Sequence, residues 1–319
     1  MKALVTGAAG FIGSHLVDRL LDRGDTVIGI DSMKLGRRDN LARAFEDSRF
    51  RLYEMDMTNI DACLQMVAKE SKAGGFDLAW HMAANSDIPA GVADSDVDFR
   101  DTFLTTFNLL KLLRVYKIPR LAFASTSAIY GVHSKLLEED LGPLFPISNY
   151  GAMKLASEAV ISAALESFLE RAWIFRFPNV VGARATHGAI YDFVRRLRMD
   201  RTLLEVLGDG SQEKPYFHVS ELIDAMLFIV EKTTERLNYF NIGTGESTTT
   251  VRYIAGAVVK RMAPGARIHY GKSNRGWIGD VPRFNYSVDK LRTLGWSPRL
   301  TSNQAVDRAI EEMVSETIE

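Results

Sequence analysis

The stretch Thr6-Gly7-Ala8-Ala9-Gly10-Phe11-Ile12-Gly13 decides the fold of this chain. It follows a short apolar run at 2–6 and leads into a segment of helical periodicity at 11–22, so its three glycines lie in a strand-to-helix turn. Glycine lets the chain turn tightly and lets a pyrophosphate approach the backbone, and the free N–H groups of a helix N-terminus attract that anion. The stretch therefore predicts a turn that binds a dinucleotide.

Asp31, at the end of the second apolar run, is the acidic partner expected of such a turn. Its carboxylate is placed to accept hydrogen bonds from the adenosine ribose hydroxyls, and its charge repels a 2′-phosphate. NAD is therefore favoured over NADP. Arg37 and Arg38 follow in the next loop and would attract a 2′-phosphate if they faced it, so NADP stays open as the alternative. Asp56-Met57, after the third apolar run, is expected to contact the adenine edge.

Apolar, β-branched runs alternate with longer segments of helical periodicity over the first 125 residues. Strands are expected at 2–6, 26–31, 50–55, 78–83, 120–125 and 172–176, and helices at 11–22, 60–71, 95–116 and 150–170. This alternation is typical of a parallel sheet covered by helices. It predicts an α/β fold with a Rossmann-type doubly wound parallel sheet.

The regular alternation stops after residue 176, where glycine and proline become more frequent. We therefore expect an NAD-binding Rossmann domain at 1–176, to which residues 219–243 return as a helix and a strand. A smaller α/β C-terminal lobe that binds substrate is expected from 177–218 and 244–319. The cluster at 247–250 is expected to cap a helix that begins at Val251.

Composition excludes several classes of protein. The chain has 319 residues, of which 46% are apolar, and its 39 Lys and Arg balance 40 Asp and Glu, so no basic excess points to nucleic acid. Cys63 is the only cysteine, which excludes intrachain disulfides and thiolate clusters, and no metal-binding cluster is visible. No apolar run approaches the roughly 20 residues that cross a bilayer. We expect a cytoplasmic protein that binds neither nucleic acid, membrane nor metal.

Tyr150 and Lys154 are four residues apart and so lie on one face of the predicted helix. A free tyrosine, with a pKa of about 10, is a poor base unless positive charge favours the phenolate, and Lys154 and an oxidised nicotinamide would both supply it. The Ser/Thr run at 125–127 ends the fifth strand, where a hydroxyl would hold the substrate oxygen. A chance Tyr-x-x-x-Lys pair and a simple helix cap are the structural alternatives, and the order of these motifs after the nucleotide turn favours catalysis.

Motifs along nearly the whole chain resemble those of an extended short-chain dehydrogenase/reductase of the NAD-dependent sugar epimerase/dehydratase family. They are T-G-A-A-G-F-I-G at 6–13, H-M-A-A-N at 81–85, S-T-S-A-I-Y-G at 125–131, Y-G-A-M-K at 150–154, R-F-P-N-V-V-G at 176–182, H-G-A-I-Y-D-F at 187–193, G-D-G-S-Q-E-K-P-Y-F-H-V at 208–219 and R-G-W-I-G-D-V-P at 275–282. Within the family, the chain is most similar to the UDP-glucose (UDP-galactose) 4-epimerases.

The resemblance implies that Tyr150 takes the proton of the sugar's C4 hydroxyl while NAD takes the C4 hydride, and that the 4-keto sugar turns over before the hydride returns. It makes Thr126, Tyr150 and Lys154 the catalytic residues. The cofactor-binding residues implied are Gly7, Ala9, Gly10, Phe11, Ile12, Gly13, Asp31, Ser32, Asp56, Met57, Met82, Ala83, Ala84, Tyr150, Lys154 and Phe177.

The resemblance also implies a nucleoside-diphosphate sugar, most simply a UDP-hexose, as substrate. Asn179 and Arg275 would contact the diphosphate, Asp280 the ribose, and the stretch 204–216 the uridine. The substrate-binding residues implied are Asn85, Ser125, Thr126, Asn179, Val206, Gln212, Tyr216, Arg275 and Asp280. A homodimer is expected through the helices near 95–116 and 150–170.

Departures from the family pattern bear on the substrate. Ser127-Ala128 stands where dehydratases of the family carry Asp-Glu, and neither residue can serve as acid or base, which argues against a 4,6-dehydratase. Arg100-Asp101-Thr102-Phe103 replaces an Asn-rich stretch that is common in epimerases. Another epimerase or oxidoreductase acting on a nucleotide sugar is one alternative. A non-catalytic nucleotide-sensing protein is another, although the chain keeps both Tyr150 and Lys154.

Overall fold

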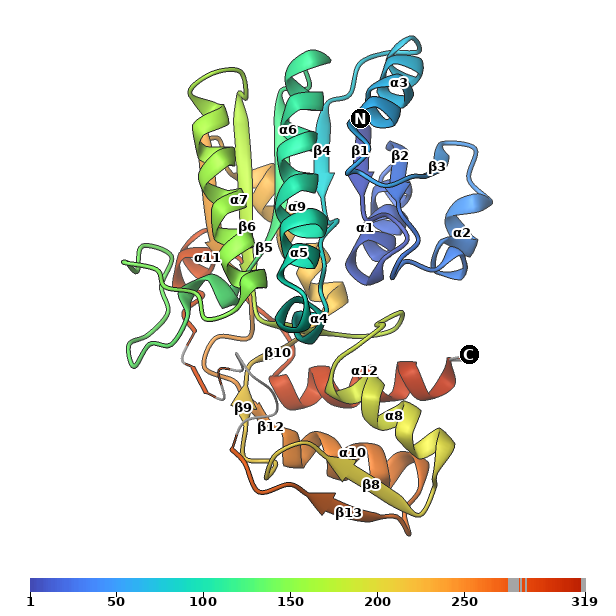
Figure 1. Ribbon diagram of the computed structural model, residues 1–319, viewed down its shortest axis with the longest axis vertical. Coiled ribbons are helices and arrows are strands. Elements are labelled where there is room, and N and C mark those ends of the chain that lie inside the picture. Colours follow the sequence, from blue (N-terminus) through green and yellow to red (C-terminus); the bar gives the residue numbers. More distant parts are fainter. Residues whose placement is uncertain (275–280, 282, 285, 317–319) are drawn as a thin grey trace.

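A seven-stranded parallel sheet forms the centre of the computed structural model, which describes residues 1–274, 281, 283–284 and 286–316 (Figure 1). Its strands are β1 (Lys2–Thr6), β2 (Thr26–Asp31), β3 (Phe50–Glu54), β4 (Leu78–His81), β5 (Arg120–Thr126), β6 (Arg171–Phe177) and β11 (Leu237–Asn241). Their spatial order is β11-β6-β5-β4-β1-β2-β3, and every neighbouring pair is parallel. The predicted Rossmann-type fold is confirmed.

Helices cover both faces of this sheet, because side chains of a strand alternate between its faces. Val5 packs in a core with α1 (Phe11–Asp22) and α9 (Val219–Lys232). Its neighbour Leu4 packs in a second core with α3 (Ile60–Ser71), α6 (Thr105–Val115) and α7 (Asn149–Leu165). Each such fully buried side chain stabilises the fold by roughly 1.5–3 kcal/mol. Together these cores leave the carboxyl ends of the strands free to form a site.

Residues 219–243 return to the sheet after an excursion into the C-terminal lobe. The helix α9 lies against α1, and β11 then pairs with β6, with Leu237 opposite Ala172. The strand extends the sheet at its β6 edge. This pairing supports the proposed division into a Rossmann domain (1–176 with 219–243) and a lobe.

The remaining elements build that lobe below the sheet (Figure 1). They are β7 (Asn179–Val181), α8 (Ala189–Met199), β8 (Leu203–Val206), β9 (Glu213–Lys214), β10 (Tyr216–His218), β12 (Thr249–Thr250), α10 (Val251–Met262), β13 (Arg267–Tyr270) and α12 (Ser302–Ser315). The helices α8, α10 and α12 share an apolar core that includes Val194, Val258 and Ile310. Thr250 caps α10 by accepting from the N–H of Tyr253 at 3.1 Å. The short helix α11 (Asp289–Thr293) instead places Leu291 in the sheet core.

Three predicted elements differ from the observed ones by two or more residues or in the type of helix, and others differ by a single residue. The helix expected at 95–116 consists of α5 (Ser95–Asp98), the π-helical η2 (Phe99–Leu104) and α6. At its middle, the hydroxyl of Thr105 donates to the carbonyl of Asp101, and side-chain bonds of this kind compete with regular helical pairing. The helix expected to reach residue 170 ends at Leu165, and the strand expected to reach 83 ends at His81.

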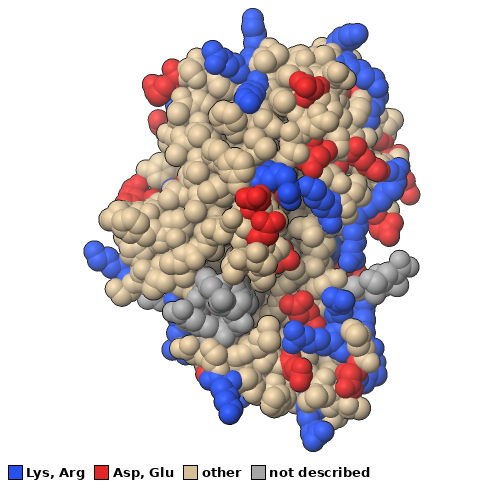
Figure 2. Space-filling model, viewed as in Figure 1, with Lys and Arg blue, Asp and Glu red and all other residues tan. Residues whose placement is uncertain are grey.

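Short elements in the connecting segments were not predicted. They are η1 (Arg38–Leu41), α2 (Ala42–Phe45), α4 (Ile88–Ala93) and η3 (Ser127–Tyr130). Among the described residues, no helix is long and apolar enough to cross a membrane. Figure 2 shows basic and acidic side chains interspersed on the viewed face, which is hollowed between the sheet domain and the lobe.

Candidate active site

The glycine turn between β1 and α1 packs too closely for any other residue. Gly7 has a φ of 68°, and a Cβ added there would lie 2.8 Å from the backbone nitrogen of Ala83. A Cβ at Gly13 would lie 1.9 Å from the carbonyl oxygen of Gly7. Gly10 is the N-cap of α1 and has no side chain to cover the first N–H groups of the helix. The turn therefore presents the helix N-terminus to an anion, as a dinucleotide pyrophosphate requires.

Asp31 ends β2 and is 7% exposed. Its Oδ2 accepts from the N–H of Ala9 at 2.9 Å, and its Oδ1 accepts from the N–H of Met33 at 2.8 Å. Burial raises the pKa of this carboxyl group, and the backbone hydrogen bonds oppose that rise. These bonds fix the carboxylate at the cavity wall, where it can accept from ribose hydroxyls. Ala9 does not itself line the cavity, because its N–H is turned toward Asp31.

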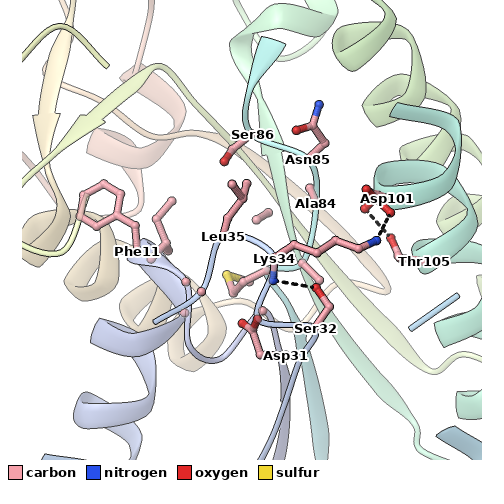
Figure 3. Close-up of a pocket in the computed structure, with 18 of the residues that line it drawn as sticks. Phe11, Asp31, Ser32, Lys34, Leu35, Ala84, Asn85, Ser86, Asp101 and Thr105 are labelled. Carbon is pink, nitrogen blue, oxygen red and sulfur yellow. Dashed lines mark hydrogen bonds and ion pairs between the residues drawn. The ribbon is translucent and has the colours of Figure 1, made fainter. Parts of the chain in front are cut away.

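A cavity of about 340 Å³ lies at the carboxyl ends of the central strands, a size that suits a small-molecule site. Its walls come from the glycine turn, the ends of β2 and β4, the segment after β3, and α7 (Figure 3). The residues implied for the cofactor that line it are Gly7, Gly10, Phe11, Ile12, Gly13, Asp31, Ser32, Asp56, Met57, Met82, Ala83, Ala84, Tyr150, Lys154 and Phe177. The structure thus brings together every residue implied for the dinucleotide except Ala9, and the walls fit that group.

The three cations of the loop after β2 all have protein partners. Lys34 Nζ lies 2.8 Å from Asp56 Oδ2 and 2.9 Å from Asp101 Oδ1. Arg37 Nη2 donates to the hydroxyl of Tyr191 at 3.3 Å. Arg38 pairs with Glu54 and stacks on the Phe45 ring, 4.6 Å from its centroid. Neither arginine lines the cavity, and Lys34, which does, is paired with two carboxylates, so no free cation is left for a 2′-phosphate among these three residues, which supports NAD over NADP.

Lys154 is held at the other end of the cavity, one helical turn after Tyr150. It is 2% exposed, and its Nζ donates to the carbonyl of Ala124 at 2.6 Å. The same Nζ lies 5.9 Å from the centroid of the Tyr150 ring. Burial lowers the pKa of Lys154 to about 7, and the carboxylate of Glu158 opposes this shift. The pKa of Lys154 therefore lies close to neutral pH.

The pKa of Tyr150 differs from the prediction that neighbouring charge lowers it. Burial raises the pKa of the phenol, a hydrogen bond with Thr126 opposes the rise, and the charge of Asp98 adds to it. Lys154 does not overcome this burial, because its Nζ is directed to the Ala124 carbonyl and is itself desolvated. The protein's own groups thus hold the phenol protonated, and the expected acidification does not come from Lys154 alone.

Thr126 and Ser125 lie on opposite faces at the end of β5. The hydroxyl of Thr126 accepts from the N–H of Ala128 at 3.1 Å, and its nearness to the phenol acts to lower the pKa of Tyr150. Thr126 therefore caps η3 and also lies near the phenol. Ser125 donates to Glu158 Oε1 at 2.5 Å in the protein interior and does not line the cavity. The alternation of side chains along a strand explains this difference.

Fewer of the residues implied for the substrate than of those implied for the cofactor line the cavity. Asn85 lines the cavity, where its Nδ2 donates to Asp98 Oδ1 at 2.8 Å. The other implied residues with described positions lie outside the cavity wall: Ser125 and Thr126 on β5, and Asn179, Val206, Gln212 and Tyr216 in the lobe. Gln212 is 3% exposed and its Oε1 has no hydrogen-bond partner among the described residues. Arg275 and Asp280 lie outside the described residues.

Sequence reasoning missed several residues that line the cavity. They include Lys34, Leu35, Gly36, Ser86, Asp87, Asp101, Thr105, Thr186 and His187. Thr186 and His187 come from the segment between β7 and α8, so the lobe also contributes to the wall. The motif at 187–193 could have pointed to His187, since it stood out in the sequence without an assigned role.

A buried histidine lies beneath the site. His81 Nδ1 is 2.6 Å from the hydroxyl of Thr6, and its Nε2 is 3.0 Å from the hydroxyl of Thr106. Burial, with the nearby charge of Lys154, lowers the pKa of His81 to about 3. The ring is therefore neutral and serves as a hydrogen-bonded part of the core.

Comparison with known proteins gives a consistent result. The model of the NAD dependent epimerase/dehydratase family matches residues 3–243. The UDP-glucose 4-epimerase of Mycolicibacterium smegmatis is 29% identical over 98% of both chains. A crystal structure of UDP-galactose 4-epimerase superposes with a TM-score of 0.83 at 32% identity, covering 98% of both chains. The UDP-glucuronic acid 4-epimerase of Bacillus cereus, in complex with UDP-glucuronic acid and NAD, superposes with a TM-score of 0.85 at 26% identity over 98% of both chains.

Proposed function

This chain belongs to the NAD dependent epimerase/dehydratase family, and from that premise we propose that it interconverts UDP-glucose and UDP-galactose at C4. The relatives act on several UDP-sugars, including glucose and glucuronic acid, so the sugar is the part of the proposal that needs its own test. The observation that carries the proposal is that Tyr150, Lys154 and Asp31 line one cavity, while Thr126 lies next to Tyr150 at the end of β5.

The cavity wall fits NAD at both ends. The glycine turn, which admits no Cβ at Gly7 or Gly13, would hold the pyrophosphate, and Asp31 would accept from the adenosine ribose. Tyr150, Lys154 and Phe177 line the end where the nicotinamide would lie. When bound, NAD supplies an acceptor that takes a hydride from the sugar carbon and gives it back.

Tyr150 is proposed as the group that moves the proton of the C4 hydroxyl. Its phenol lies near the Thr126 hydroxyl, so a sugar hydroxyl placed between the two side chains would have a donor and an acceptor within reach. Before it can take this proton the phenol must itself be deprotonated, and the charge of bound oxidised NAD, together with Lys154 fixed on the Ala124 carbonyl one turn away, would favour that phenolate. The proton taken by Tyr150 Oη would return to the sugar oxygen after the keto sugar presents its other face.

The substrate is proposed to lie between the cavity and the lobe. Asn85 lines the cavity, while Asn179, Gln212 and Tyr216 belong to the lobe that faces it. We also propose a homodimer through η2, α6 and α7. Phe99 and Phe107 are 51% and 41% exposed there and both contact the ring of Phe103, so an apolar row lies on the surface. Sedimentation of the purified protein tests this part.

Incubation with a panel of nucleotide sugars tests the function. UDP-glucose, UDP-N-acetylglucosamine, UDP-glucuronate, GDP-mannose and dTDP-glucose are each supplied to the NAD-loaded protein, and products are separated by stereoisomer. We expect UDP-galactose from UDP-glucose with no net release of reduced cofactor. Preferred turnover of another UDP-sugar would replace the substrate, and stoichiometric NADH would indicate a net oxidoreductase. Absence of any conversion would contradict the proposal.

A further inference from the structure

The side chain of Lys34 extends along the adenosine end of the cavity. Lys34 lies in the loop after β2, and its Nζ forms ion pairs with Asp56, which follows β3, and with Asp101 on η2. The side chain therefore connects three separate parts of the Rossmann domain (Figure 3). All three side chains line the cavity. Their exposed fractions are 46% for Lys34, 33% for Asp56 and 18% for Asp101, which places the two ion pairs at the rim rather than in the interior.

Both carboxylates are held in position by other groups. Asp56 Oδ1 accepts from the N–H of Thr58 at 2.8 Å. Asp101 accepts from the guanidinium of Arg100 at 3.0 and 3.1 Å. Partial burial raises the pKa of each carboxyl group, but these bonds and Lys34 outweigh it and lower the pKa overall. The acceptors are therefore charged and oriented before Lys34 reaches them.

We propose that Lys34 is a cofactor-retaining residue, whose ion pairs with Asp56 and Asp101 close the adenosine end of the cavity and slow the release of NAD. The inference rests on the dinucleotide site described above. A dinucleotide that filled this cavity from Asp31 to Tyr150 would have the Lys34 side chain and its two partners beside its adenosine end. To leave from that end, it must wait until both ion pairs open. Retention is compatible with turnover, since an epimerase regenerates its cofactor in each cycle.

The rate of NAD release from the loaded protein tests this inference. Protein carrying adenine-labelled NAD is mixed with excess unlabelled NAD, and the label that stays bound is followed with time in Lys34→Met, Asp101→Asn and the double variant. Rim ion pairs contribute little each, so we expect release about threefold to tenfold faster in each single variant. The double variant should be no faster than Lys34→Met, because both changes break the same contact. Added salt should speed release in the parent more than in Lys34→Met.

Arg38→Met is the matched control, since it removes a cation of the same loop that pairs with Glu54 and does not line the cavity. Its release rate should equal that of the parent. Unchanged release in both Lys34→Met and Asp101→Asn would overturn the inference. Faster release in Lys34→Met alone would also overturn it, because Lys34 would then bind the cofactor directly. These outcomes are independent of which sugar is converted, so a failure here is distinguishable from a failure of the proposed function.

Discussion

At the end of the cavity where Tyr150 and Lys154 lie, the lysine is buried and bound to the protein, whereas at the adenosine end Lys34 lies near the surface and pairs with two carboxylates. Lys154 is 2% exposed and hydrogen bonds to a strand carbonyl, while the side chain of Lys34 is 46% exposed and pairs with two carboxylates. Lysine is thus proposed to serve two purposes in this protein. The buried Lys154 is proposed to hold its charge at a fixed place near Tyr150, and the exposed Lys34 is proposed to slow the release of NAD.

The largest effect is expected at the buried end, from Tyr150→Phe. This change removes the oxygen that would move the proton and keeps the ring, so turnover of UDP-glucose should fall by roughly 10² to 10⁴-fold. NAD content and the rate of NAD release should match the parent, because the adenosine end is untouched. Steady-state rates and the label-release assay measure both quantities. Turnover at the level of the parent would show that another group moves the proton.

The next largest effect is expected from Glu158→Gln, which removes a buried carboxylate that contacts Ser125 on β5 and Arg176 on β6. Glu158 pairs with Arg176 at 2.7 Å, accepts from Ser125, and has its side chain 7% exposed. Removing its charge leaves Arg176 buried without its ion pair, so the free energy of unfolding should fall by about 3–5 kcal/mol. Urea unfolding measures it.

Glu54→Gln is the matched control for this change. Glu54 pairs with Arg38 and its side chain is 50% exposed, so the same substitution should cost less than about 1 kcal/mol. Equal losses in the two variants would contradict the distinction between the buried and the exposed end.

The sequence predicted the parts of the site that are local. The glycine turn, Asp31 and the pair Tyr150 and Lys154 each depend on residues a few positions apart, or on the end of an apolar run, and the predicted strand at 2–6 and helix at 11–22 have the observed bounds. Such features follow from turn geometry and helical periodicity. The fold and most of the residues that line the dinucleotide cavity could therefore be predicted from the sequence.

The parts that depend on tertiary packing could not be predicted. Lys34 and Asp101 are 67 positions apart and meet only because both segments lie beyond the carboxyl ends of the strands. Ser125 was expected in the site, but the strand's register turns it to Glu158. The burial of Tyr150 and Lys154, which shifts the pKa of both groups, also depends on tertiary packing and could not be predicted.

A smaller effect is expected from pH, through the neutral histidine beneath the buried end. The pKa of His81 is about 3 in the folded protein and about 6.5 in the unfolded chain, so the unfolded chain binds more protons between these values. Stability is therefore complete above pH of about 6.5 and falls as pH drops, by up to about 1.4 kcal/mol per pH unit. The free energy of unfolding, measured with urea between pH 6.5 and 4.5, should depend less steeply on pH in His81→Asn, by the equivalent of about one bound proton. Equal slopes would mean that His81 is not held neutral.

The smallest effect is expected from Tyr191→Phe, which tests whether a contact between the loop of Lys34 and the lobe also slows the release of NAD. The hydroxyl of Tyr191 accepts from Arg37 at 3.3 Å and so joins the loop that carries Lys34 to α8 of the lobe. A long hydrogen bond that is partly open to water contributes about 0.5–1 kcal/mol at most. We expect unfolding to change by no more than this and NAD release to quicken by less than about threefold, because the ion pairs of Lys34 still close the opening. Release as fast as in Lys34→Met would place the restraint in the lobe instead, since loss of a single loop contact would then suffice to free the cofactor.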